Sequence, residues 1–439
     1  MPSLRRNIVY QFLYELLIVF IPLFTIPYVS RVLGAENIGL FSYTYAVANY
    51  FVLFANLGIK NYGSRTIAMV RNNKEELNRN FSEILSIHII FSIIVIFVYL
   101  VLLFFFVEDN LVIFLIQSIY VFAAVFDINW FFFGIEKFKL TVGRNTLVKI
   151  LSVFLVLVFV KTQTDLWIYA LILALSVFVG QSVVWFALKQ YVSWRRPSWA
   201  NMKQHIRPLF VLFLPILALS LYKYMDKIML GSISSNVQVG FYENAEKIIN
   251  VPMSLIMAFG VVLMPRIANM VTSKDKGEVF KLIDMSMEAV MLLAIAISFG
   301  LAGISFVLAP IFFGYEFEEC GILIMGLAVT VPFMAFANVI RTQYLIPYKE
   351  DKIFVVSLFL GAAVNLIVNI ILIPYMAARG AVIGTIFAEI IVCIYQSYFV
   401  RKKIFIKKYL LNTIPPILIG IVMFVFVFQI GNVMNINIV

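Results

Sequence analysis

Long runs of apolar residues, separated by short polar segments, fill the chain from end to end. Most runs are about 20 residues long, the length at which an α-helix crosses the hydrocarbon of a bilayer. Strands of a membrane barrel would be shorter and would alternate in polarity. The pattern therefore predicts an all-α integral membrane protein. It predicts about thirteen spans, near residues 8–31, 38–58, 82–106, 111–134, 147–161, 166–188, 209–231, 239–264, 285–309, 320–342, 353–375, 380–400 and 409–430.

The composition excludes a soluble protein. Of the 439 residues, 63% are hydrophobic and only 13% are charged, so a water-soluble fold would leave large apolar areas facing water. Cys320 and Cys393 form no spacing motif and are expected to be free thiols. Arg5 and Arg6 precede the first apolar run as in a signal peptide, but the run lacks a small-residue cleavage site. It is expected to be an uncleaved first helix.

The basic residues indicate how the chain is oriented. With the N-terminus on the inside, 28 of the 34 lysines and arginines fall on inner segments, and only Arg31, Lys161 and Arg379 fall on outer ones. The remaining three lie within spans. This asymmetry follows the positive-inside rule and predicts a multi-pass membrane protein with a cytoplasmic N-terminus. It also accounts for the net charge of +11 without any nucleic acid partner.

The loops leave no room for a folded soluble domain, which argues against an enzyme. A membrane glycan polymerase or ligase would need an outer loop that carries catalytic residues. The chain also has no phosphate-binding glycine loop, no cluster of metal ligands and no nucleophile motif, so no catalytic residue, metal or cofactor is expected. His88 and His205 are isolated in the sequence, and each is expected to be hydrogen-bonded or solvated.

Two stretches about 200 residues apart resemble each other. Gly39 corresponds to Gly240 at a separation of 201 residues, and Arg65 corresponds to Arg266 at the same separation. Because this period covers six spans, an even number, both halves would have the same orientation in the membrane. The repeat predicts a six-helix lobe at 1–200, a second six-helix lobe at 201–402, and a further transmembrane helix at 403–439, alone or as one of a pair.

Several segments resemble the polysaccharide flippases called Wzx, of the multidrug/oligosaccharidyl-lipid/polysaccharide exporter superfamily. The matching segments are 27–34, 39–42, 61–65, 226–231, 240–247, 264–266 and 380–385, together with Asn365, Asn369 and Glu389. The resemblance implies two six-helix lobes around a central cavity, with alternating access. It also implies undecaprenyl-pyrophosphate-linked oligosaccharide as the substrate, with a polysaccharide polymerase and glycosyltransferases as pathway partners.

Charged residues inside spans are the strongest candidates for function, because a charge in hydrocarbon normally faces a partner or a cavity. Two triplets each share one helical face and lie at similar depth. They are Lys223, Asp226 and Lys227 on span 7, and Glu243, Glu246 and Lys247 on span 8. They are expected to form one linked set, either as a neutral network between helices or as a cavity wall or gate. The candidates for gating or ion coupling are Asp127, Lys223, Asp226, Glu243, Glu246, Lys247 and Glu389.

A pyrophosphate needs cations, and arginine suits its oxygens through paired N–H donors. The candidates at span ends or inside spans are Arg31, Lys60, Arg65, Lys227, Arg266 and Arg341. The positive-inside bias is an alternative explanation for Lys60, Arg65, Arg266 and Arg341. Arg31 is more informative because it lies on the outer side, where cations are scarce.

The expected function is therefore to flip lipid-linked oligosaccharide from the inner to the outer leaflet for surface polysaccharide synthesis. Coupling to protons or sodium could use Asp127, Asp226 or Glu389, and the sequence does not choose among them. The alternatives are a peptidoglycan-precursor flippase, a cation-coupled drug exporter of the same superfamily and, from a different class, the membrane polymerase or ligase.

Overall fold

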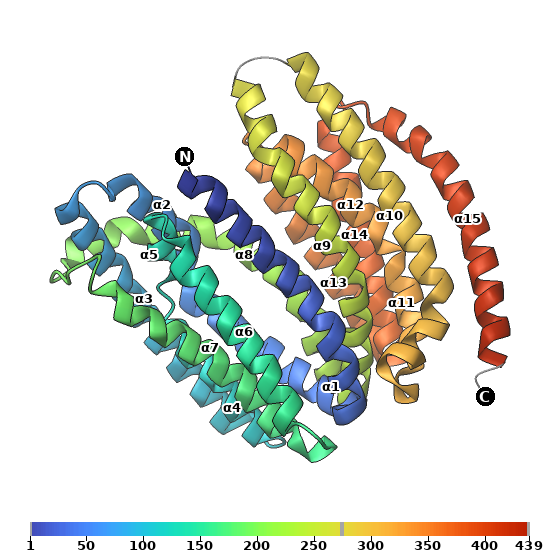
Figure 1. Cartoon of the computed structure of the whole chain (residues 1–439), viewed down its shortest axis with the longest axis horizontal. Helices are drawn as coiled ribbons and strands as arrows, with labels where there is room; N and C mark the ends of the chain where they lie inside the picture. The colour runs from blue at the N-terminus through green and yellow to red at the C-terminus, as the bar shows by residue number, and fades with distance from the viewer. Residues whose placement is uncertain (1, 273–275, 437–439) are drawn as a thin grey trace. The chain divides into compact units, whose positions relative to one another are not determined.

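The computed structural model describes residues 2–272 and 276–436, and every regular element in this part of the chain is helical (Figure 1). The α-helices are α1 (Pro2–Asn56), α2 (Ile59–Val70), α3 (Lys74–Phe106), α4 (Leu111–Val125), α5 (Asn129–Gly134), α6 (Phe138–Phe159), α7 (Leu166–Leu188), α8 (Trp199–Ile233), α9 (Asn236–Thr272), α10 (Lys276–Phe313), α11 (Cys320–Ala328), α12 (Thr330–Ile340), α13 (Asp351–Met376), α14 (Ala378–Val400) and α15 (Ile406–Ile436). Three short helical segments, η1 (Gln163–Asp165), η2 (Tyr315–Phe317) and η3 (Arg341–Leu345), link some of them.

Twelve helical stretches of the described residues are long and apolar enough to cross a membrane, which confirms a multi-pass all-α membrane protein. The first stretch, Leu23–Val70, is 48 residues long and includes a break in α1. At this break Gly34 has φ 75° and ψ 172°, a conformation that a residue with a Cβ rarely adopts. The break lies between the first two predicted spans, 8–31 and 38–58, so these two spans share one stretch.

Three predicted spans differ from the helices. The span predicted at 147–161 is too short, since α6 runs from Phe138 to Phe159. The predicted span left out Arg144, but α6 accommodates this residue, whose guanidinium donates to the Gly180 carbonyl at 2.8 Å. The spans predicted at 111–134 and 320–342 are each divided, the first into α4 and α5 and the second into α11, α12 and η3.

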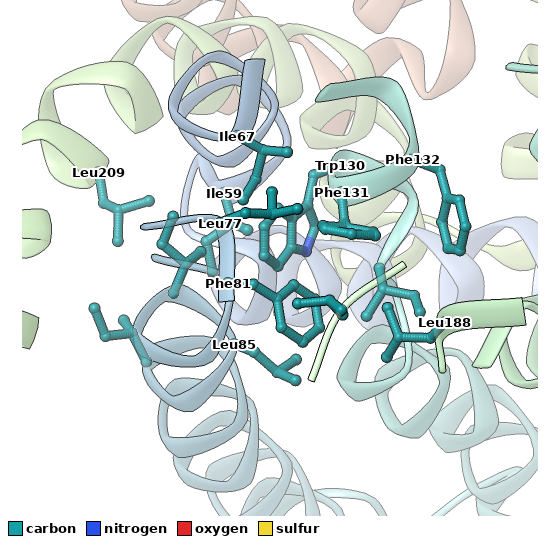
Figure 2. Close-up of a cluster of buried hydrophobic side chains, with 14 of the residues drawn as sticks. Ile59, Ile67, Leu77, Phe81, Leu85, Trp130, Phe131, Phe132, Leu188 and Leu209 are labelled. Atoms are coloured by element: carbon teal, nitrogen blue, oxygen red, sulfur yellow. The ribbon is translucent and has the colours of Figure 1, made fainter. Parts of the chain in front are cut away.

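The chain forms two compact units. Unit 1 comprises residues 1–33 and 41–220, and unit 2 comprises residues 34–40 and 221–439. In unit 1, buried side chains of α2, α3, α5, α7 and α8 form one hydrophobic cluster (Figure 2). Its centre is Trp130, whose ring stacks on Phe81 with centroids 5.6 Å apart. The cluster joins helices that are distant in the sequence and holds the start of α3 against α5.

Unit 2 is built around α9 to α14, with α15 packed along α10 (Figure 1). The short α1 segment that follows Gly34 belongs to this unit. The N–H of Ala35 donates to Oε1 of Glu316 at 2.7 Å, so a carboxylate satisfies a backbone donor that the break in α1 leaves free. A hydrogen bond therefore holds the segment 34–40 to unit 2, and the helix break at Gly34 marks where this segment begins.

Both cysteines are free, as the absence of a spacing motif predicted. Cys320 is buried at the start of α11, and its thiol donates to the carbonyl of Phe241.

The expected lobes at 1–200 and 201–402 and the further helix at 403–439 remain a proposal.

Candidate functional site

A buried carboxylate on α8, Asp226, is the centre of a polar cluster inside unit 2. Its Oδ2 accepts hydrogen bonds from the hydroxyl of Tyr242 at 2.6 Å and from that of Thr385 at 3.0 Å. Its Oδ1 accepts from the amide nitrogen of Asn369 at 2.6 Å. These partners come from α9, α14 and α13, so four helices meet at one carboxylate. Asp226 is only 4% exposed and Asn369 is fully buried.

The oxygens of this cluster outnumber its donors. The Asn369 amide nitrogen also donates to Oδ1 of Asn365 at 3.1 Å, whereas Oδ1 of Asn369 has no hydrogen-bond partner among the described residues. Gly384 makes room for that oxygen, because a Cβ at this position would lie 2.1 Å from it. A buried acceptor without a donor is costly and needs an explanation. A bound cation would supply one.

The donor set fits a hard cation rather than a transition metal. Carboxylate, amide and hydroxyl oxygens suit cations with oxygen preference, whereas His and Cys suit softer metals. Within residues 2–272 and 276–436, no three His, Cys, Asp or Glu side chains gather in a group that could hold a metal ion. The cluster can therefore hold a proton or a hard monovalent cation at Asp226.

A second network consists of ion pairs between α8 and α9, and it begins at Lys227, the residue that follows Asp226. The ammonium of Lys227 lies 2.5 Å from Oε2 of Glu243 and 2.8 Å from Oε2 of Glu246. Lys247 closes the set, with its ammonium 3.1 Å from Oε1 of Glu243. The side chains of Lys227 and Glu243 are 10% and 14% exposed. Four charges thus neutralise one another and join α8 to α9.

The expectation that two triplets form one linked set is right for four residues and wrong for two. Asp226 belongs to the polar cluster instead, and Lys223 is exposed, with its ammonium 5.3 Å from the centre of the Tyr224 ring. Consecutive helical residues point about 100° apart, since a turn takes 3.6 residues. Both side chains contact α9, but Asp226 also turns toward Asn369 of α13 and Thr385 of α14, whereas Lys227 turns toward Glu243 and Glu246.

Another charged pair, which the sequence did not link, lies at the end of α12. Arg341 begins the π-helical segment η3, donates to Oδ1 of Asn338 at 2.5 Å and lies over the ring of Phe354. Glu389 of α14 is buried and interacts electrostatically with Arg341. Single π-helical turns often occur at functional positions. In the same segment η3, Gln343 is fully buried, and neither polar atom of its amide has a partner within the described ranges.

The remaining cationic candidates are exposed. Arg31 lies on α1, Lys60 and Arg65 lie on α2, and Arg266 lies on α9. The first three belong to unit 1 and Arg266 to unit 2. Lys227 differs from all of them because two carboxylates already neutralise its charge. Its ammonium would contact a pyrophosphate only after those pairs open.

In unit 1, Asp127 occupies the break between α4 and α5. Its Oδ1 accepts from the backbone N–H of Asn129 at 3.0 Å and from the side-chain amide at 2.7 Å. That amide also donates to Gln181 at 2.9 Å, and Arg144 donates to Oδ1 of Asn129 at 3.1 Å. Asp127 is thus linked through Asn129 to an arginine that sequence analysis had assigned to a loop.

The two histidines differ. His205 lies between Glu83 and Tyr62, with Nε2 3.0 Å from Oε2 of Glu83 and Nδ1 2.6 Å from the Tyr62 hydroxyl. It is hydrogen-bonded, as expected. Glu83 also accepts from Asn201 at 3.0 Å. His88 is fully buried, and neither ring nitrogen has a partner among the described residues, so the expectation of a bonded or solvated side chain is wrong for it.

Sequence reasoning missed Glu83, although it is a charge inside a predicted span. Its position at the start of 82–106 made it look like a residue of the inner boundary. In the structure it is 1% exposed. Charge within a predicted span was therefore the signal that could have identified it. The roles of Asn369, Asn365 and Thr385 had no comparable signal, because neutral polar side chains are tolerated in membrane helices.

Comparison with known proteins gives consistent matches. The family model described as "Polysaccharide biosynthesis protein" matches residues 4–271. A protein of Shigella dysenteriae named "Putative O-antigen transporter" is 24% identical over 90% of this chain and 99% of its own length. A protein of Escherichia coli (strain K12) with the same name is 26% identical over 91% of this chain and 97% of its own length. The lipid II flippase MurJ of Bacillus subtilis (strain 168) is 28% identical, over 47% of this chain and 41% of its own length.

Solved structures share the fold. An inward closed conformation of the lipid II flippase MurJ aligns over 98% of both chains with a TM-score of 0.72 and 16% identity. An inward-facing multidrug resistance MATE family transporter of the MOP superfamily aligns over 89% of this chain and 97% of its own, with a TM-score of 0.69 and 14% identity. These matches confirm the all-α membrane fold. Since the family model covers well over half of the 439 residues, the chain belongs to the polysaccharide biosynthesis protein family.

Proposed function

We propose that this protein flips undecaprenyl-pyrophosphate-linked oligosaccharide repeat units from the inner to the outer leaflet of the bacterial cytoplasmic membrane. The observation that carries the proposal is similarity along nearly the whole chain to two proteins named for O-antigen transport. A polar headgroup cannot cross about 30 Å of hydrocarbon unaided. A membrane protein that offers the headgroup polar surroundings on alternate sides lowers that barrier while the lipid tail stays in the bilayer.

The proposed coupling site is Asp226. Its carboxylate, the unpaired oxygen of Asn369 and the hydroxyl of Thr385 supply oxygen ligands for a sodium ion, or the carboxylate itself takes up a proton. Asp127 and Glu389 remain weaker candidates. Asn129 already binds the carboxylate of Asp127, and Glu389 interacts with Arg341. Binding at Asp226 would neutralise a buried charge and so bias the packing of α8, α9, α13 and α14.

The proposed ligands of the pyrophosphate are Arg31, Lys60, Arg65, Arg266 and Arg341, with Lys227 after its ion pairs open. The exposure of the first four supports this assignment, since a side chain at a membrane helix end can reach a headgroup through water. The set Lys227, Glu243, Glu246 and Lys247 is proposed as a gate element: these charges hold α8 to α9 in this state and become available when the helices separate.

The proposal includes orientation and partners. The N-terminus would be cytoplasmic, as the distribution of lysine and arginine favours. Glycosyltransferases would supply the substrate on the inner face, and a polymerase would use it on the outer face. An enzyme is disfavoured because the relatives are named as transporters or flippases, and the structural neighbours are transporters.

Deletion of the gene in its own host tests the proposal. We expect loss of one surface polysaccharide and accumulation of its lipid-linked repeat unit, because synthesis continues while export stops. Intact peptidoglycan synthesis in the deletion strain would separate this function from that of a peptidoglycan-precursor flippase. Unchanged surface polysaccharide together with increased drug sensitivity would contradict the proposal and favour the exporter.

A further inference from the structure

Glu83 of α3 binds α8 through two side chains that lie one helical turn apart. Its Oε1 accepts from the amide nitrogen of Asn201 at 3.0 Å, and its Oε2 lies 3.0 Å from Nε2 of His205. Glu83 is 1% exposed and His205 is 3% exposed. A carboxylate only accepts hydrogen bonds, so the hydrogen of the second contact lies on Nε2. Nδ1 of the imidazole is then left for another partner.

That partner is Tyr62 of α2, whose hydroxyl lies 2.6 Å from Nδ1 of His205. A second contact with α8 lies at the residue before α2. A Cβ at Gly58 would lie 2.8 Å from the carbonyl oxygen of Leu209. The two contacts are four residues apart on each side, in opposite order along the chain. Together they fix where α2 lies along α8.

The other side of α2 packs on α3 and α5. Ile59 and Ile67 belong to the hydrophobic cluster of unit 1 (Figure 2), and a Cβ at Gly63 would lie 2.5 Å from the ring of Trp130. Apolar contacts are not directional, whereas a hydrogen bond weakens steeply when it bends. The hydrogen bond between the Tyr62 hydroxyl and α8 therefore fixes how this 12-residue helix is rotated about its axis.

The exposed face of α2 is cationic. Lys60, Asn61 and Arg65 are exposed, and the helix has no acidic residue. Lys60 and Arg65 are two of the proposed ligands of the pyrophosphate. Both belong to the same short helix as Tyr62, so a rotation of α2 about its axis would turn both cations away together.

We propose that His205 is a positioning residue for the lipid-linked substrate. Glu83 orients the imidazole, and the imidazole holds Tyr62. The resulting rotation of α2 presents Lys60 and Arg65 to the pyrophosphate in one geometry. This inference rests on the proposed function, because it assumes that these two cations bind the substrate.

The burial of Glu83 and His205 supports positioning over simple stabilisation. Apolar side chains of similar volume would hold α3 to α8 about as well, because desolvation of a buried ionic group offsets most of its attraction. The polar network adds one defined geometry instead. Its base is firmly held, since Ser82, beside Glu83 on α3, accepts the backbone N–H of Arg195 from the segment before α8 at 2.9 Å.

Flipping of a fluorescent undecaprenyl-pyrophosphate-linked oligosaccharide, measured in proteoliposomes at increasing substrate content, tests the inference. Tyr62→Phe removes the hydroxyl and keeps the ring. We expect the apparent KM to rise about twofold to tenfold, because the hydrogen bond can bias the position of α2 by no more than its own free energy. The maximal rate should be unchanged, as for a loss of binding alone.

Tyr99→Phe is the matched control. It removes another buried hydroxyl of unit 1, which donates to the Phe114 carbonyl at 3.0 Å. Both variants should lose similar stability, and only Tyr62→Phe should raise the KM. A KM that is unchanged in Tyr62→Phe, or that rises equally in Tyr99→Phe, would overturn the inference.

A leucine pair separates positioning from stability. Glu83→Leu combined with His205→Leu replaces the buried polar groups by apolar ones, so the melting temperature should stay near that of the wild type while the KM rises as in Tyr62→Phe. Adding Tyr62→Phe to this pair should raise the KM no further, because the hydroxyl has already lost its partner. A further rise would overturn the inference. If the leucine pair does not fold, Tyr62→Phe decides alone.

Failure of the inference is distinguishable from failure of the proposed function. Wild-type flipping with an unchanged KM in Tyr62→Phe contradicts only the positioning role of His205. A wild-type protein that does not flip the lipid-linked oligosaccharide contradicts the proposed function, and this inference with it.

Discussion

Gly39 and Gly240 lie in backbone contact where the α1 segment after Gly34 crosses the start of α9. A Cβ on Gly39 would lie 1.6 Å from the carbonyl oxygen of Asn236 and 2.8 Å from the nitrogen of Gly240. A Cβ on Gly240 would lie 2.1 Å from the carbonyl oxygen of Ala35. These are also the two glycines that the sequence repeat pairs at a separation of 201 residues. Small residues at such a crossing let two membrane helices approach closely.

Gly39→Ala or Gly240→Ala should therefore separate these helices. We expect each variant to lose about 1–3 kcal/mol of stability through overpacking and to lose glycan export. Thermal unfolding of the purified protein and surface glycan in a complemented deletion strain would measure both effects. Gly143→Ala is the control, since a Cβ there meets nothing within 4 Å. Wild-type stability in the Gly39 and Gly240 variants would show that the close crossing is not required.

Lys227 should be essential to the packing of α8 on α9. In Lys227→Met, Glu243 and Glu246 keep their charges but lose their shared cation. Removal of one partner from a buried pair costs about 3–5 kcal/mol, and partial exposure of these side chains favours the lower value. The melting temperature should drop clearly, whereas Lys223→Met, at an exposed position, should leave it near the wild-type value.

A triple variant separates the effect of unpaired charge from the effect of lost packing. Lys227→Met combined with Glu243→Gln and Glu246→Gln removes the uncompensated carboxylates, so it should be more stable than Lys227→Met alone. If the triple variant is less stable than the single one, the loss comes from packing rather than from unpaired charge.

The helices and the ion-pair set could be predicted because both follow from local spacing. Apolar runs of membrane length indicated the helices, and residues three and four apart indicated that Glu243, Glu246 and Lys247 share a face. The same spacing could not separate Asp226 from Lys227. Only the tertiary structure shows that Asp226 bonds to side chains of α13 and α14 as well as α9, whereas Lys227 pairs with two carboxylates of α9.

The rest of the site depends on contacts across long separations. Asn369 and Thr385 are 143 and 159 residues from Asp226, and no local pattern links neutral side chains to a distant carboxylate. Arg144 fell outside the predicted span 147–161, whereas hydrogen bonds to Asn129 and Gly180 satisfy it within α6. Burial does not distinguish His88 from His205, because both side chains are buried. Only their hydrogen-bond partners differ.

Asp226→Asn should uncouple transport from its driving ion. Asparagine keeps the shape of the side chain but removes the charge that would bind sodium or a proton. Flipping in proteoliposomes should then no longer respond to a sodium gradient or to a pH gradient, whichever accelerates the wild type. Asp351→Asn, at an exposed position at the start of α13, is the matched control. An unchanged response in Asp226→Asn would exclude Asp226 as the coupling site.

Arg31 and Arg266 should each be needed for export. Alanine at either position should abolish surface glycan while the protein inserts at normal levels, and lysine should restore it only in part, because a guanidinium binds phosphate oxygens through paired donors. Arg196→Ala, in an exposed loop, serves as the comparison. Full complementation by both alanine variants would remove these arginines from the proposed substrate site.

The inner loops should be inaccessible from outside the cell. Single cysteines at Asn73 and Lys402, in a chain with Cys320 and Cys393 replaced by alanine, should resist an impermeant thiol reagent in intact cells. A cysteine at Glu108, in a segment predicted to be outside, should react. Labelling at the first two positions with protection at the third would reverse the proposed orientation.

Flipping by the purified protein tests the central claim most directly. Proteoliposomes would carry a fluorescent undecaprenyl-pyrophosphate-linked oligosaccharide in both leaflets, and an impermeant enzyme outside would cleave the exposed glycan. The account predicts that about half of the lipid is cleaved in empty vesicles and nearly all of it in vesicles with the protein, with no glycan transferred to an added acceptor. A cleaved fraction equal to that of empty vesicles, or transfer to the acceptor, would contradict the flippase function.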